Sequence, residues 1–111
     1  MSAAEMSTNT KMLLIFVDET AKHGETSLYE AVVRRLLARG VAGATVNMGV
    51  MGFGVHLHLH RRRLLGVSDD RPVTITAVDG EAKIREVIPE VRELLAGQGL
   101  MVLLDAEVIK A

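Results

Sequence analysis

The chain alternates short apolar runs with amphipathic segments, and the first two predict a strand followed by a helix. Residues 12–17 are apolar without alternation and end at Asp18, which is typical of a strand covered on both faces. Residues 27–40 then follow a helical period, with Ser27 and Glu30 spaced as a capping box and Gly40 at the C-cap position. The apolar face of this helix is predicted to comprise Leu28, Val32 and Leu36, flanked by Tyr29, Val33 and Leu37.

Three further strands are predicted in the rest of the chain. Residues 42–50 and 100–109 are rich in apolar side chains, and Pro72 opens a third segment, 73–78, whose threonines and aliphatic residues suit a pleated sheet. Asp79 and the glycine after it end that segment.

A second amphipathic helix is predicted over residues 84–95, closing at Gly97. Pro89 lies in its middle and removes one backbone hydrogen bond, so we expect a kink or two helical pieces meeting near Ile88. Its apolar side is formed by Ile84, Val87, Ile88, Val91, Leu94 and Leu95.

The order strand, helix, strand, strand, helix, strand predicts an α+β fold. It matches the ferredoxin-like βαββαβ sandwich, a four-stranded antiparallel sheet with two helices on one face. The other sheet face would leave part of segment 12–17 exposed, so we expect burial against symmetry mates in a closed homo-oligomer, most simply a trimer.

Composition narrows the classes of function. The chain has 111 residues, of which 49% are hydrophobic, so we expect one domain over residues 11–111 after a disordered terminus at 1–10. Cysteine is absent, which excludes disulfides and thiolate chemistry and fits a cytoplasmic location. A net charge of −1 and three aromatic residues argue against nucleic acid as a partner.

The most distinctive stretch is a long loop predicted over residues 50–71. Gly49, Gly52 and Gly54 follow a strand, yet no helix and no lysine with serine or threonine completes a phosphate-binding loop. These glycines either shape a ligand cleft or bend the end of a strand. Phe53 between them either lines the same cleft or anchors packing.

Histidines at 56, 58 and 60 alternate with aliphatic residues, so an extended backbone would place all three imidazoles on one face. His56, His58 and His60 are therefore candidate ligands for a divalent metal such as zinc, nickel or copper. The alternative is a solvated loop with modest pH sensitivity.

Arg61, Arg62 and Arg63 follow His60 and make the loop basic. They suit phosphate, an acidic protein surface or anionic lipid, or else serve only solubility. His23 and Gly24 precede the first helix, where His23 would cap the helix or line a ligand cleft. We find no set of residues typical of an enzyme active site and expect no enzymatic activity, with a hydrolase that acts on a bound nucleotide as the alternative.

Several of these motifs resemble the PII-like proteins of the domain-of-unknown-function 190 family. The resemblance covers residues 11–110 and is densest from Gly43 to Gly54. It is carried by His23 with Leu28-Tyr29-Glu30, Gly43-Ala44-Thr45-Val46, Gly49 with Gly52-Phe53-Gly54, His60, Ser68, Pro72 and Val78-Asp79.

The resemblance implies a ferredoxin-like trimer that binds an adenine nucleotide such as ATP or ADP between subunits. It also implies a loop that contacts a partner protein, which among relatives includes membrane transporters and channels. The nucleotide motif of PII proteins is represented here by residues 79–83, so Asp79 and Lys83 join the candidate ligand residues. Met48 and Arg71 depart from the family pattern, which commonly has arginine and leucine there. A CutA-like trimer that binds metal through the histidines is the alternative.

Overall fold

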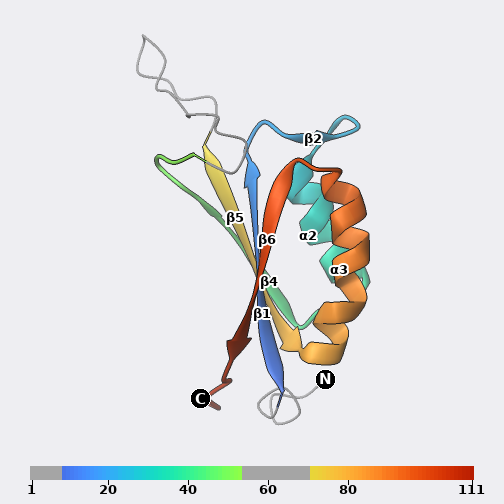
Figure 1. The fold of residues 1–111 in the computed structure, drawn as a ribbon, viewed down its shortest axis with the longest axis vertical. Helices are drawn as coiled ribbons and strands as arrows, with labels where there is room; N and C mark the ends of the chain where they lie inside the picture. Colours follow the sequence, from blue (N-terminus) through green and yellow to red (C-terminus); the bar gives the residue numbers. More distant parts are fainter. Residues whose placement is uncertain (1–8, 54–70) are drawn as a thin grey trace.

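The computed structural model describes residues 9–53 and 71–111 and confirms the predicted ferredoxin-like fold. Four antiparallel strands lie in the order β4-β5-β1-β6, and both helices cover one face of this sheet (Figure 1). The elements are β1 (Thr10–Asp18), β2 (Lys22–His23), β3 (Thr26–Ser27), α2 (Leu28–Ala38), β4 (Gly43–Met48), β5 (Pro72–Gly80), α3 (Glu81–Leu95) and β6 (Gly99–Ala106).

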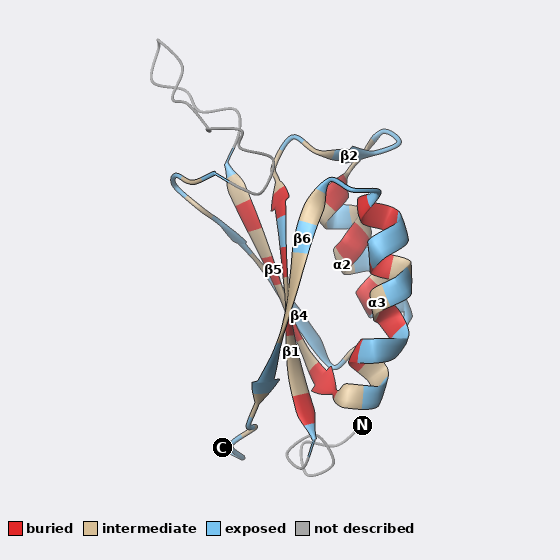
Figure 2. Cartoon of the chain, viewed as in Figure 1, coloured by how far each residue is buried: buried red, intermediate tan, exposed pale blue. Residues whose placement is uncertain are grey.

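The core lies between the sheet and the helices. Because side chains alternate along a strand, every second residue from Leu13 to Val17 in β1 and from Val73 to Ala77 in β5 faces α2 and α3 and is buried (Figure 2). Ile15 is central, opposite Ile75 of β5 on one side and Met101 of β6 on the other. Burying an aliphatic side chain of this size stabilises the fold by about 2 kcal/mol. The buried apolar residues are Leu13, Ile15, Val17, Leu28, Val32, Leu36, Val73, Ile75, Ala77, Ile84, Val87, Val91, Leu94 and Leu95.

Helix α2 begins and ends where the sequence predicts, but its first turn is not capped in the predicted way. Gly40 has a φ of 77°, and its amide together with that of Val41 bonds back to the carbonyls of Leu37 and Leu36, which is a Schellman motif. Ser27 is the N-cap residue, yet its side chain makes no capping hydrogen bond, so the predicted capping box is wrong. Leu37 was predicted at the margin of the apolar face, but it is 77% exposed because neither the sheet nor α3 covers that side of the helix.

Helix α3 runs unbroken across Pro89, so the alternative of two helical pieces is wrong. A nearly continuous row of buried side chains holds the helix on the sheet on both sides of the proline. The helix ends at Leu95, where Ala96 adopts the left-handed conformation with a φ of 47° and Gly97 follows with a φ of 83°.

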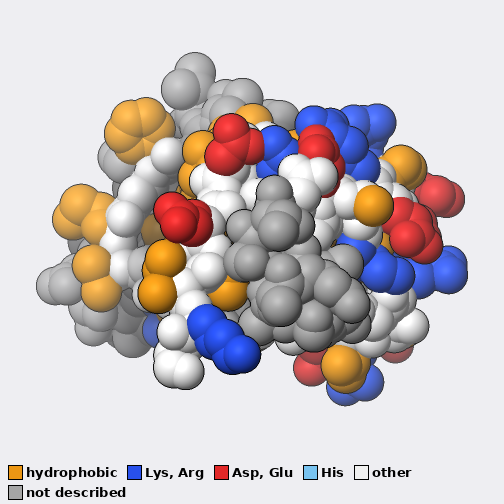
Figure 3. Space-filling model, turned by 90° about the horizontal axis from the view of Figure 1, so that it is seen from below, with side chains coloured by type: hydrophobic (Ala, Val, Ile, Leu, Met, Phe, Trp, Pro, Cys, Tyr) orange, Lys and Arg blue, Asp and Glu red, His pale blue; other side chains and the backbone are white. Residues whose placement is uncertain are grey.

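The second face of the sheet is not covered by any described element. The register shows that the half of this face formed by β1 and β6 is apolar. The half formed by β5 and β4 is mixed, with three threonines beside a valine, an asparagine and a glycine. Phe16 is 38% exposed in the single chain. Figure 3 views the molecule from the lower end of Figure 1 and shows apolar side chains at the surface on the side away from the helices. The apolar residues of this open face are Met12, Leu14, Phe16, Leu100, Val102 and Leu104.

Candidate functional site

The structure divides the predicted ligand residues between the two ends of the sheet. Gly49, Gly52 and Phe53 lie at the upper end in Figure 1, where β5 begins, whereas Asp79 and Lys83 lie where β5 ends and α3 begins. Strand β5 has nine residues, so these ends are separated by roughly 27 Å. The two sets of residues in one chain are therefore too far apart to bind the same phosphate group.

The upper end is the base of the predicted loop, and two glycines allow its backbone to pack tightly. The amide of Gly49 donates to the carbonyl of Pro72 at 2.6 Å. A Cβ at Gly49 would lie 2.6 Å from Pro72 Cγ, and one at Gly52 would lie 3.3 Å from the same atom. Larger residues at either position would force the end of β4 away from the start of β5.

Glu19 and Arg71 form a bidentate ion pair at the loop base. Arg71 Nε donates to Glu19 Oε1 at 3.0 Å and Nη2 donates to Oε2 at 2.6 Å, while the Glu19 amide donates to the Arg71 carbonyl at 2.9 Å. Hydrogen bonding to the Arg71 side chain lowers the pKa of Glu19, and the same contact raises the pKa of Arg71. Tyr29, in the first turn of α2, adds a weaker electrostatic contribution to the pKa of Arg71. The sequence did not point to this pair, because its members are 52 residues apart.

An exposed apolar segment adjoins this pair. Val50, Met51 and Phe53 are 97%, 77% and 70% exposed. Of the two interpretations of Phe53, the packing anchor is therefore wrong within the described chain. Met48, the other departure from the family pattern, lies opposite Val73 at the end of β4, so both departures lie at this end of the sheet.

His23 and Gly24 lie in a small hairpin of β2 and β3 that the sequence did not predict. Gly24 has a φ of 62° at its turn, and His23 is exposed. His23 does not cap α2, because Ser27 occupies the N-cap position. The turn after α3 supports the hairpin, since the Gln98 side-chain amide donates to the Lys22 carbonyl at 3.2 Å.

Asp79 and Lys83 make structural contacts at the lower end. The carboxylate of Asp79, which is 1% exposed, accepts hydrogen bonds from the amides of Ala42 at 2.9 Å and Gly80 at 2.6 Å. Lys83 Nζ donates to the carbonyl of Arg39 at the end of α2. Their role as ligand residues stays a prediction, but these contacts join α2, β4, β5 and α3.

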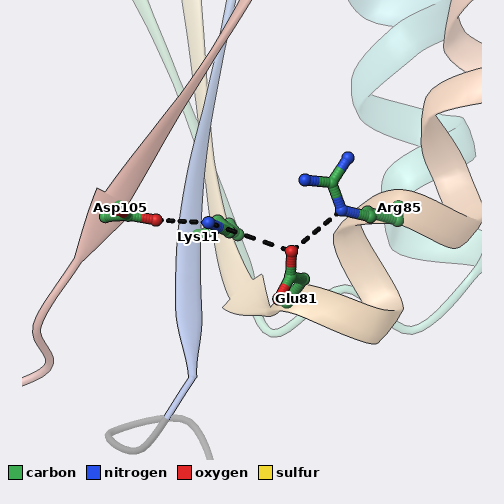
Figure 4. Close-up of polar contacts among 4 residues, drawn as sticks. All are labelled: Lys11, Glu81, Arg85 and Asp105. Carbon is green, nitrogen blue, oxygen red and sulfur yellow. Dashed lines mark hydrogen bonds and ion pairs between the residues drawn. The ribbon is translucent and has the colours of Figure 1, made fainter.

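A chain of ion pairs also lies at this end (Figure 4). Lys11 of β1 lies between the carboxylates of Asp105 in β6 and Glu81 in α3, and Glu81 also accepts from Arg85 at 2.9 Å. Hydrogen bonds from Arg85 and Lys11 lower the pKa values of Glu81 and Asp105, respectively. The network joins three elements and balances its own charge, which is typical of a structural contact.

The remaining predicted site residues lie outside the described part of the chain. They are Gly54, the candidate metal ligands His56, His58 and His60, and the basic residues Arg61, Arg62 and Arg63. Within 9–53 and 71–111, no three histidine, cysteine or acidic side chains are placed to hold a metal ion. The two described helices are also too short and too polar to cross a membrane.

Comparison with known proteins identifies relatives over nearly the whole chain. The model of the DUF190 family, described as "Uncharacterized ACR", matches residues 10–108. The UPF0166 protein of Methanocaldococcus jannaschii is 32% identical over 100 residues, which are 90% of this chain and 92% of that protein. A UPF0166 protein of Aquifex aeolicus is 30% identical over 99 residues, with coverages of 89% and 92%.

Solved structures show the same fold. CPII from Thiomonas intermedia K12, a nitrogen regulatory PII-like protein bound to ADP, AMP and bicarbonate, superposes with a TM-score of 0.68 at 22% identity. The alignment covers 91% of this chain and 89% of CPII. GlnK of B. subtilis superposes with a TM-score of 0.52 at 17% identity, covering 86% and 85% of the two chains. The chain therefore belongs to the DUF190 family and has a PII-like variant of the ferredoxin-like fold.

Proposed function

We propose that this protein is a regulatory module that binds an adenine nucleotide and contacts a partner protein through the loop 50–71. The observation that carries the proposal is the loop base, where Gly49 and Gly52 pack against Pro72 beside an ion-paired arginine. These contacts fix the end of the sheet, and the long loop begins there. Ligand binding at the loop base can therefore change the contacts that the loop makes with a partner. CPII, which shares the fold, binds ADP and AMP, and this supports adenine nucleotides as the ligand class.

The proposed module is a cytoplasmic homotrimer. The open face of the sheet supports self-association, because six apolar side chains line its half formed by β1 and β6. Burying such a patch against copies of the same chain removes it from water without a second protein. Nucleotide would then bind where subunits meet, so that binding and assembly are coupled.

Light scattering tests the assembly. The wild-type protein is expected at three times the 12.0 kDa mass of one chain. Phe16→Glu places a charge on the open face and should reduce the mass to that of one chain. Leu37→Glu is the matched control, because Leu37 is exposed on α2, away from the open face, and its replacement should leave the mass unchanged. A wild-type protein that stays a single chain at micromolar concentration would refute the trimer.

Titration calorimetry tests the ligand. The metal-stripped protein should bind ATP, ADP or AMP with micromolar affinity and one site per subunit, and GTP should bind more weakly if the base is recognised. Absence of saturable heat with all three adenine nucleotides, together with absence of competition, would overturn the proposed ligand class.

The proposed partner is a protein contacted by His60, Arg61, Arg62 and Arg63, with a membrane transporter or channel as the expected class. Differential binding of nucleotide to two arrangements of the loop would change the affinity for that partner. Co-purification of the tagged wild-type chain with and without ATP, against a variant with all three arginines changed to serine, tests this step. Equal recovery of a specific partner by both proteins would exclude the arginines as the contact.

A further inference from the structure

The ion pair at the loop base leaves half of its arginine available. Glu19 accepts from Nε and Nη2 of Arg71 and thereby occupies one edge of the guanidinium group. The second edge, formed by Nη1 and the other Nη2 proton, has no hydrogen-bond partner among the residues that the structure describes. Guanidinium groups carry five donors in a fixed plane, so one edge can be held by a carboxylate while the other binds a second anion.

The position of the pair makes this second edge useful. Arg71 immediately precedes Pro72, against which Gly49 and Gly52 pack, and its side chain is 46% exposed. Exposed ion pairs contribute little to stability, so anchoring the fold is a weak explanation for a two-pronged contact here. The contact does fix the plane of a side chain that would otherwise sample many rotamers.

We infer that Arg71 binds the phosphate chain of the nucleotide through the free edge of its guanidinium group, and that Glu19 is the residue that positions it. This inference rests on the proposed function and assigns that site its anion-binding residue. Arginine suits the task because two parallel N–H groups match two phosphate oxygens, whereas lysine offers only a point charge. Holding the guanidinium in advance reduces the ordering required when the ligand binds.

Other arginines of the described chain provide a matched control. Arg39, the C-cap residue of α2, also pairs with a carboxylate, with its Nη2 2.8 Å from Glu90 Oε1, and is similarly exposed at 52%. It lies on the helix surface at the opposite end of α2 from Tyr29, away from the loop base. Loss of Arg39 therefore removes one positive charge and one exposed ion pair without touching the proposed site.

Calorimetric titration of four variants with adenosine, AMP, ADP and ATP tests the inference. Arg71→Leu should weaken ADP and ATP binding by about tenfold or more and leave adenosine binding unchanged, because only the phosphate contact is lost. Arg71→Lys should recover part of the affinity, since charge returns without the planar fork. Glu19→Gln should weaken ADP binding by roughly threefold without affecting adenosine, because a neutral amide holds the arginine less firmly. Arg39→Leu should bind every ligand as the wild type does.

The outcomes separate this inference from the function on which it rests. If the wild type binds ADP and Arg71→Leu binds it equally well, the inference is wrong and the proposed function stands. If the wild type binds no adenine nucleotide, both are wrong. A parallel loss of adenosine and ADP affinity would indicate general damage to the site and would also refute a phosphate contact. Should Arg71→Leu fail to fold, the charge-conserving Arg71→Lys decides, since unchanged ADP affinity in that variant contradicts recognition by the fork.

Discussion

Replacing Asp79 with alanine should destabilise the protein strongly. The carboxylate is buried, and its two oxygens accept from the amides of Ala42 and Gly80 at 2.9 and 2.6 Å. A hydrogen bond to a charged group contributes about 1.5–3 kcal/mol, so losing both gives an upper range of roughly 3–6 kcal/mol. Ala42 is exposed, so its amide regains water, whereas the buried Gly80 amide does not. We therefore expect a loss near the lower end, about 3 kcal/mol.

Urea unfolding followed by far-ultraviolet circular dichroism measures this loss, because the chain has no tryptophan to serve as a fluorescent probe. Chain concentration must be held constant, because the proposed self-association would add to the apparent stability. Asp79→Asn keeps one acceptor oxygen but turns its amide nitrogen toward a backbone donor, so it should lie between wild type and Asp79→Ala. Glu93→Ala removes an exposed carboxylate of α3 and serves as the control. An Asp79→Ala protein within about 0.5 kcal/mol of wild type would show that the two amides do not depend on this side chain.

Three further predictions concern backbone and charge. Ala96→Gly should stabilise the protein by about 0.5–1 kcal/mol in the same urea assay, because Ala96 holds a left-handed conformation that costs alanine more than glycine; a loss of stability would contradict this. Gly99→Ala should destabilise the protein by about 1–3 kcal/mol, because the added Cβ would lie 2.7 Å from the Phe16 carbonyl oxygen. Gly43→Ala is the control and should be nearly neutral, because a Cβ there has no atom within 4 Å. Equal effects of the two substitutions would refute the steric argument. Folding lowers the pKa values of Glu19, Glu81 and Asp105 from their unfolded values of 4.5, 4.5 and 3.8. The ionised carboxylates therefore stabilise the folded state above these unfolded pKa values, and this stabilisation is lost as the pH falls through the lower pKa values of the folded state. Urea midpoints measured below pH 4.5 should therefore decline, and a Glu19→Gln variant should decline less steeply than the wild type.

Most of the fold follows from the sequence, because both helices and the central strands have strong periodic patterns. The buried positions of α3 agree with its predicted apolar side, and Gly40 marks the end of α2 in the way that its conformational freedom suggests. The ends of two strands differ from the predicted ones. Strand β4 ends at Met48 rather than 50, and β6 ends at Ala106 rather than 109, because apolar residues continue beyond the last ladder pair. The hairpin at 22–27 has strands of two residues, which are too short to show any period.

The candidate site was less predictable than the fold, since it depends on contacts between distant segments. Gly49 and Gly52 were recognisable as residues for close backbone approach, but their shared contact, Pro72, was visible only in the structure. The pairing of Glu19 with Arg71 has no local signal, because an acidic residue after a strand and a basic residue before a proline are common at turns. For Asp79 the sequence did give a local signal, because its position resembles a ligand motif, but the structure shows its carboxylate buried against backbone amides.

At the upper end of the sheet an arginine lies beside an exposed apolar segment, and this combination supports the proposal that the upper end is the functional one. At the lower end, Lys11 contacts two carboxylates and the Asp79 carboxylate accepts from two amides. At the upper end, among the described residues, one edge of Arg71 lacks a partner and Phe53 is largely exposed. Groups that a fold leaves available beside a rigid junction are the ones that a ligand can use without disrupting the core. A phosphate on the guanidinium edge and a planar base on the exposed apolar segment would together accommodate a nucleotide. The proposal therefore places the response to ligand at the loop base and not at the buried Asp79.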